Sequence, residues 1–169
     1  MRENWRGSRY AAGNTAGPGG TPRRADVIVV GAGPVGLTVA LGLGRAGISV
    51  IVLERRATIR DTSRAIGITP ASLEIFQRYH VATDLIAAGL PVRQAVIHGD
   101  TRVVAAPDFA AVSSPFPFIL TLPQRRTEEI LAAHVHRLPT VQIIRGEEVT
   151  MLEQHEHGGT VWYTQPKQS

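Results

Sequence analysis

The segment Asp26–Leu37, which reads Asp-Val-Ile-Val-Val-Gly-Ala-Gly-Pro-Val-Gly-Leu, constrains the fold of this chain more than any other feature. Four β-branched apolar residues, typical of a buried strand, lead directly into Gly31, Gly33 and Gly36 of a GxGxxG pattern. Pro34 stands where the first helical residue is expected, because its missing N–H and fixed φ suit a helix start. The pattern predicts a strand, a tight glycine turn and a helix.

An acidic residue follows at the spacing that such a unit uses for a nucleotide ribose. The apolar run 48–53 predicts a second parallel strand, and Glu54 ends it 18 residues after Gly36. A carboxylate there can accept a hydrogen bond from a ribose 2′-hydroxyl, while the helix N-terminus offers N–H groups to a pyrophosphate. In this interpretation Gly31 permits the turn, Gly33 admits the pyrophosphate and Gly36 lets the helix pack on the strand. The sequence therefore predicts a dinucleotide site.

The charge of the chain is concentrated at its N-terminus. The 169 residues, enough for one domain, carry a formal net charge of +4. Residues 1–25 hold five arginines against one glutamate, and basic and acidic residues balance in the remainder. This balance and an aromatic content of 5% argue against nucleic-acid binding. Because residues 1–25 are rich in glycine and show no apolar periodicity, we expect a disordered basic tail.

Several classes of site and location are disfavoured by composition. The chain has no cysteine, which excludes disulfides and thiolate chemistry and suits a reducing cytoplasm. Glycines and a proline interrupt the uncharged stretch 27–44, so we expect no membrane span. His134 and His136 would face different sides of a helix, and His155 and His157 lack acidic or cysteine partners. We therefore expect no metal site.

The rest of the pattern predicts an α/β chain in which a β-rich segment is inserted after a Rossmann-like βαβ unit. The expected elements are a helix capped by Thr69 and started by Pro70, a short helix over 83–88, strands within 92–122, a helix over 124–138, and strands over 141–145, 148–154 and 160–164, the last two joined by a turn at Gly158-Gly159.

Three separated stretches resemble the flavoprotein aromatic hydroxylases of the para-hydroxybenzoate hydroxylase type, which include polyketide hydroxylases. They are the glycine segment with Glu54-Arg55, the segment 63–70 with an Arg-Ala-x-Gly-Ile pattern, and the segment 122–131 with a Pro-Gln-x-x-x-Glu-x-x-Leu pattern. The resemblance implies that Arg64 reaches the phosphate and ribityl region of FAD and that Gln124 contacts the ribityl chain. The full set of implied FAD contacts is Gly31, Gly33, Val35, Gly36, Glu54, Arg55, Arg64 and Gln124.

The resemblance also implies a reaction, the hydroxylation of an aromatic or polyketide substrate with FAD, NAD(P)H and dioxygen. It implies that residues 26–169 form a partial FAD-binding domain, in which 92–122 begin an excursion into a substrate domain. The family's later Asp-Gly and Gly-Asp-Ala-x-His segments do not occur. The pair Gly99-Asp100 is not the start of the second segment, because Thr101 follows it. We therefore expect an incomplete enzyme that needs a C-terminal part, supplied by a complementing chain if the protein is split, and no catalytic residue is nominated.

Two alternatives stay open at this point. One is a non-catalytic remnant or interaction module that retains the FAD-binding fold, which the missing later segments favour. The other is an FAD-dependent oxidoreductase of different chemistry, such as a dehydrogenase, which the segments around Arg64 and Gln124 disfavour. A plain NAD(H) dehydrogenase leaves those two residues unexplained.

Overall fold

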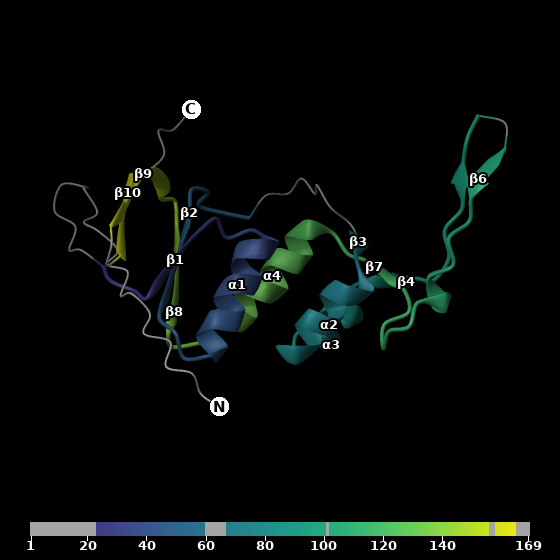
Figure 1. Cartoon of the computed structure of the whole chain (residues 1–169), viewed down its shortest axis with the longest axis horizontal. Coiled ribbons are helices and arrows are strands. Elements are labelled where there is room, and N and C mark those ends of the chain that lie inside the picture. The colour runs from purple at the N-terminus through teal and green to yellow at the C-terminus, as the bar shows by residue number, and fades with distance from the viewer. Residues whose placement is uncertain (1–22, 60–66, 101, 156–157, 165–169) are drawn as a thin grey trace. The chain divides into compact units, whose positions relative to one another are not determined.

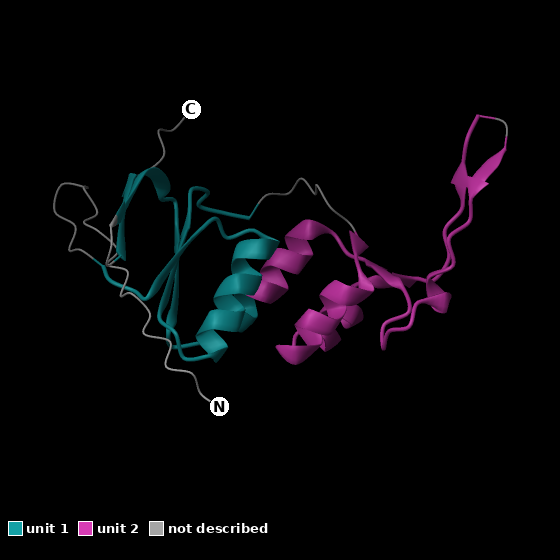
Figure 2. Cartoon of the chain, viewed as in Figure 1, with its two compact units in different colours: residues 1–59, 132–169 teal, residues 60–131 magenta. Residues whose placement is uncertain are grey.

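The computed structural model describes residues 23–59, 67–100, 102–155 and 158–164. The chain divides into two compact units, unit 1 with residues 1–59 and 132–169 and unit 2 with residues 60–131 (Figure 2). Most of the predicted basic tail, residues 1–22, lies outside the described residues. The predicted division at 92–122 stays a prediction.

Unit 1 is built on a parallel sheet with the strand order β1-β2-β8 (Figure 1). Its elements are β1 (Val27–Val30), α1 (Pro34–Arg45), β2 (Val50–Glu54) and β8 (Val141–Arg145). β1 and β2 pair in parallel with Val27 opposite Val50, and α1 connects them. All five residues of the central strand β2 are buried, as expected for a parallel sheet that is covered on both faces. The predicted Rossmann-like βαβ unit is confirmed.

Glycines let α1 approach one face of this sheet closely. A Cβ atom at Gly36 would lie 3.2 Å from Cγ1 of Val29 in β1. A Cβ atom at Gly44 would overlap Cγ2 of Val141 in β8 and lie 2.9 Å from Cδ1 of Leu138. The helix therefore packs at a distance that larger residues at these two positions would prevent.

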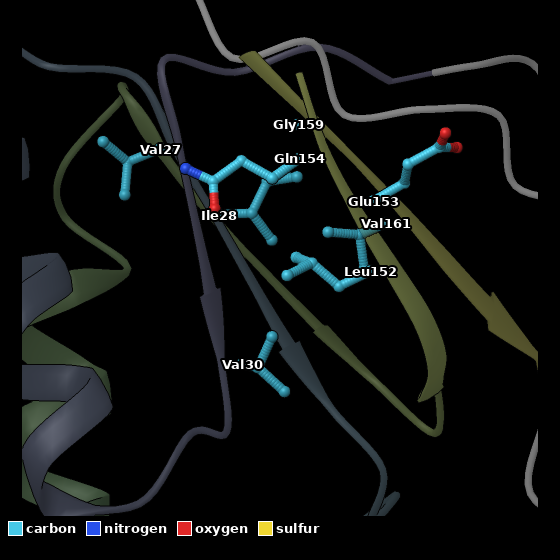
Figure 3. A pocket seen from close by; sticks show the side chains of 8 residues that line it. All are labelled: Val27, Ile28, Val30, Leu152, Glu153, Gln154, Gly159 and Val161. Carbon is cyan, nitrogen blue, oxygen red and sulfur yellow. The ribbon is translucent and has the colours of Figure 1, made fainter. Parts of the chain in front are cut away.

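A hairpin covers the other face of the sheet. It consists of β9 (Glu148–His155) and β10 (Gly158–Thr164), which pair in antiparallel fashion. Ala25, Ile51, Leu53 and Val161 form a buried apolar cluster here. A cavity of about 340 Å³ opens between β1 and this hairpin, where Figure 3 shows apolar side chains from both gathered. Its lining residues are Val27, Ile28, Val30, Leu152, Glu153, Gln154, Gly159 and Val161.

Unit 2 combines short antiparallel strands with helices. A three-stranded sheet has the order β3-β7-β4, and β5 and β6 form a separate two-stranded ribbon. The elements are β3 (Gly67–Ile68), α2 (Pro70–Arg78), α3 (Ala82–Ala88), β4 (Leu90–Val92), β5 (Ile97–His98), β6 (Val103–Ala105), η1 (Phe109–Ala111), β7 (Ile119–Thr121) and the start of α4 (Gln124–Val135). The Thr69 side chain accepts a hydrogen bond from Ser72 N at 3.3 Å, which confirms the predicted N-cap of α2.

Three details differ from the sequence prediction. Gly158 and Gly159 pair with His155 and Gln154 and belong to β10, so the predicted turn at these glycines is wrong. The helix predicted over 124–138 ends at Val135, where backbone bonds tighten into a final turn. The sequence also missed β3 and β4, because strands of two or three residues carry almost no periodic signal.

Candidate nucleotide-binding site

The three glycines of the GxGxxG segment meet three different structural requirements. Gly31 has a φ of +100°, which side chains rarely tolerate, and its N–H donates to Leu53 O at 2.7 Å. A Cβ atom at Gly36 would collide with the carbonyl oxygen of Gly31. Gly33 is extended at φ −76° and ψ −179°, and nothing lies within 4 Å of where its Cβ would be. The space beside Gly33 is therefore open to a ligand.

The N-terminus of α1 faces this space without a cap of its own. Gly33 is the N-cap residue and supplies no side-chain hydrogen bond, and the first turn contains no acidic residue. The N–H of Leu37 is the first to bond within the helix, to Gly33 O at 2.9 Å. The N–H groups of Val35 and Gly36 precede it and, like those of any first helical turn, lack intrahelical acceptors. Such a helix end binds anions, and phosphate in particular.

Glu54 lies directly beside the glycine turn. The residue is 7% exposed, and its Oε2 accepts a hydrogen bond from Ala32 N at 2.8 Å, across 22 residues of sequence. Its Oε1 accepts from Arg56 N at 3.0 Å. Each carboxylate oxygen has a second lone pair, so Glu54 can still accept hydrogen bonds from a ligand hydroxyl. The structure brings the glycines and the acid together as the sequence predicts.

Of the two arginines after Glu54, the second lies nearer the carboxylate. Arg55 is exposed, and its Nη1 lies 3.9 Å from Glu148 Oε1. Arg56 Nη1 lies 4.0 Å from Glu54 Oε1, and Arg56 Nε is buried without a hydrogen-bond partner. Sequence reasoning named Arg55 and missed Arg56, although the doubled arginine was a visible signal. Buried N–H groups are rarely left without an acceptor in folded proteins, so this one singles out Arg56 as a side chain whose partner the described protein atoms do not supply.

The last two predicted residues lie elsewhere in the chain. Arg64 falls outside the described residues. Gln124 belongs to unit 2, where it begins α4. Its Nε2 donates a hydrogen bond of 2.7 Å to Oε1 of Glu128, a residue that is 6% exposed. Sequence reasoning assigned no role to Glu128, although it is the acid of the Pro-Gln-x-x-x-Glu pattern.

The unit 1 residues fit the adenosine diphosphate half of a dinucleotide. A Cβ at Gly33 would fill the empty space, the first turn of α1 offers N–H groups, and Glu54 can hold a ribose. Within the described ranges, no group of three His, Asp or Glu side chains gathers in a way that could hold a metal ion. No helix in these ranges is both long and apolar enough to cross a bilayer.

Comparisons with known proteins agree with this geometry. Residues 24–169 match the family described as FAD binding domain. The chain is 35% identical over 145 residues to the 12-dehydrotetracycline 5-monooxygenase/anhydrotetracycline 6-monooxygenase of Streptomyces rimosus, covering 85% of this chain and 28% of that protein. It is 31% identical over 143 residues to the para-nitrophenol 4-monooxygenase of a Pseudomonas species, covering 83% of this chain and 36% of that protein.

The fold matches solved structures of the same kind. The OxyS anhydrotetracycline hydroxylase from Streptomyces rimosus superposes with a TM-score of 0.73 at 33% identity, over 83% of this chain and 28% of that chain. The chain thus spans about a third of the length of the curated relatives it matches. With its glycine turn, the buried Glu54 beside it and its matched family, the chain belongs to the FAD-binding domains of the aromatic and polyketide monooxygenases.

Proposed function

We propose that this chain supplies the FAD-binding part of a monooxygenase that hydroxylates a small aromatic or polyketide substrate with NAD(P)H and dioxygen. The observation that carries the proposal is the open space at Gly33 beside the uncapped first turn of α1 and the buried carboxylate of Glu54. The redox chemistry belongs to the bound flavin, and the protein supplies binding, orientation and electrostatics.

The proposed contacts are those that the sequence predicts, with Arg56 added. The N–H groups of Val35 and Gly36 bind the pyrophosphate, and Glu54 accepts a hydrogen bond from the adenosine ribose. Arg56 joins them because its Nη1 lies 4.0 Å from Glu54 Oε1, and Arg55 lies at the same end of β2. Arg64 and Gln124 serve the phosphate and ribityl part of the cofactor.

We further propose that β1 receives another strand, from the polypeptide that corresponds to the remaining length of the relatives, in the same or a complementing chain. The N–H groups of Val27 and Gly31 bond to Ser49 O and Leu53 O in the direction of β2. The alternate residues Ile28 and Val30 therefore direct their backbone groups to the opposite edge.

That opposite edge has the features of an unfinished sheet. In the described part of the chain, β1 has a strand neighbour on one side only. Val30 is 60% exposed and lines the apolar cavity beside the hairpin. Parallel sheets are normally buried, and an open apolar edge is a template for strand addition.

The proposal includes a location in the cytoplasm, because a chain without cysteine is suited to a reducing compartment.

Binding of ADP and FAD to the purified chain, measured by calorimetry, tests the nucleotide site. Gly33→Val should raise the dissociation constants for ADP and FAD by tenfold or more, because the new side chain fills the space beside the helix N-terminus. Gly33 already has a φ that valine adopts, so the melting temperature should change little. Val39→Thr, on the exposed side of α1, is the matched control. Parent-like binding by Gly33→Val would show that the site is assigned wrongly.

Activity separates the hydroxylase part from the alternative of a non-catalytic FAD-binding module. The purified 169-residue chain with FAD, NAD(P)H and a phenol should form no hydroxylated product, because a pocket that excludes water is needed and the relatives are about three times longer. Product formed at a catalytic rate by this chain alone would contradict the need for further polypeptide. If co-expression with the C-terminal part of a related hydroxylase restores no NAD(P)H oxidation, the non-catalytic alternative is favoured.

A further inference from the structure

Two neighbouring acids on α4 have contrasting environments. Glu129 binds two cations, with Arg125 Nε at 2.9 Å and Arg126 Nη1 at 3.0 Å. Glu128 is buried, and its hydrogen-bond partner in the described part of the chain is the neutral amide of Gln124, at 2.7 Å. Acids are rarely buried without a cationic partner, because burial removes the hydration of the charge. An ion pair therefore does not account for the burial of Glu128, and its contact with the Gln124 amide needs another explanation.

The chemistry of the two groups fixes how the amide is turned. An ionised carboxylate only accepts hydrogen bonds, whereas an amide has a donating nitrogen and an accepting oxygen. The contact therefore requires Gln124 Nε2 to face Glu128 and turns Oε1 away from it. Since Gln124 and Glu128 are four residues apart on one helix, they occupy the same face and the contact is held by the helix itself.

We propose that Glu128 is a positioning residue, which orients the Gln124 amide so that its oxygen accepts a hydrogen bond from a hydroxyl of the ribityl chain. This inference rests on the proposed role of Gln124 in FAD binding. It identifies the kind of group that Gln124 recognises, a hydroxyl donor, and not an acceptor such as a flavin carbonyl. A fixed amide also loses less conformational entropy when the cofactor binds.

The ratio of the dissociation constants for ADP and FAD tests this role, because ADP lacks the ribityl chain. The parent chain should bind FAD more tightly than ADP. Glu128→Gln should weaken FAD binding by about 3- to 10-fold, the size of one hydrogen bond, because an amide partner allows Gln124 to turn either way. The affinity for ADP should stay unchanged. Glu129→Gln, one position along the same helix, should alter neither constant.

A double variant guards against a folding defect in Glu128→Gln. Gln124→Met/Glu128→Gln has no buried charge at this position, and should lose the FAD preference to the same extent as Glu128→Gln, because the two residues act as one unit. An equal loss of ADP and FAD affinity in Glu128→Gln, an unchanged ratio in either variant, or a parent that binds both ligands equally would overturn the inference. A parent that binds neither ligand contradicts the proposed function itself, and this inference with it.

Discussion

Strand β2 and the ribbon of β5 and β6 are made of similar residues but have opposite environments. β2 reads Val-Ile-Val-Leu-Glu and is entirely buried, whereas the residues of β5 and β6 are all exposed, including Val103 and Val104. β2 has α1 on one face and the β9–β10 hairpin on the other, and within the described residues nothing comparable covers the ribbon. Apolar β-branched composition thus indicates a strand, while the covering elements decide whether the strand stabilises the fold.

Leu53→Ala should produce the largest effect and tests the buried side of this comparison. Leu53 is 2% exposed and belongs to the cluster with Ile51 and Val161. Its truncation should lower the free energy of unfolding by about 2–5 kcal/mol, because it removes buried methyl groups and leaves a cavity. Urea unfolding followed by circular dichroism gives this value. A loss below about 1 kcal/mol would mean that the hairpin does not cover β2 in solution.

Gly36→Ala should follow in size and tests how closely α1 covers the sheet. The added methyl group would collide with Gly31 O, so the helix must shift, at a cost of about 1–3 kcal/mol. Gly33→Ala is the matched control, since its Cβ meets no atom within 4 Å, and should alter stability by less than about 0.5 kcal/mol. Equal losses in the two variants would contradict the different roles assigned to these glycines.

Glu129→Gln measures how little a partly exposed charge contributes to stability compared with a buried apolar side chain. Hydrogen bonds from Arg125, and then from Arg126, lower the pKa of Glu129 below its ordinary value of 4.5. The folded-state pKa is depressed, so the stabilisation is present above the ordinary value and is lost as the pH falls through the folded-state pKa. At pH 7 each pair should contribute about 0.3–0.5 kcal/mol. The free energy of unfolding of parent and variant is measured at pH 7 and in acid. The difference between them should vanish in acid, and a difference that persists there would contradict the ion pairs.

Val104→Thr should produce the smallest effect and tests the exposed side of the comparison. Val104 is 65% exposed, and threonine keeps its shape and strand preference. The free energy of unfolding should change by less than about 0.5 kcal/mol. A larger loss, or a change in sedimentation behaviour, would show that the ribbon is covered in solution.

Local sequence was sufficient for the segment that carries the site. Its turn, helix start and following strand are determined within about 30 residues by glycines, Pro34 and apolar runs, and all appear in the structure. The N-cap at Thr69 was predictable for the same reason, because a cap bonds three residues ahead. Such features depend on neighbours in sequence, which pattern reasoning can read.

Contacts between distant residues were not predictable in this way. The pairing of β3 with β7 joins Gly67 to Thr121, and strands this short carry no pattern that specifies a partner. Gly158-Gly159 has the composition of a turn, yet pairing with β9 places it in a strand. Hydrogen-bonded pairing with a neighbouring strand outweighs the turn preference of the glycines, because β propensity depends on context.

The sequence by itself determined the dinucleotide-binding unit and the residue types of its site, because turn geometry, helix initiation and apolar periodicity are local properties. Only the tertiary structure decided which side chains are held in place. It set Glu54 against Ala32 N, gave Arg56 and not Arg55 the place beside that carboxylate, and paired Gln124 with Glu128. The physical reason is that hydrogen-bond partners and burial depend on which atoms folding brings within about 3 Å, a distance that sequence spacing does not specify.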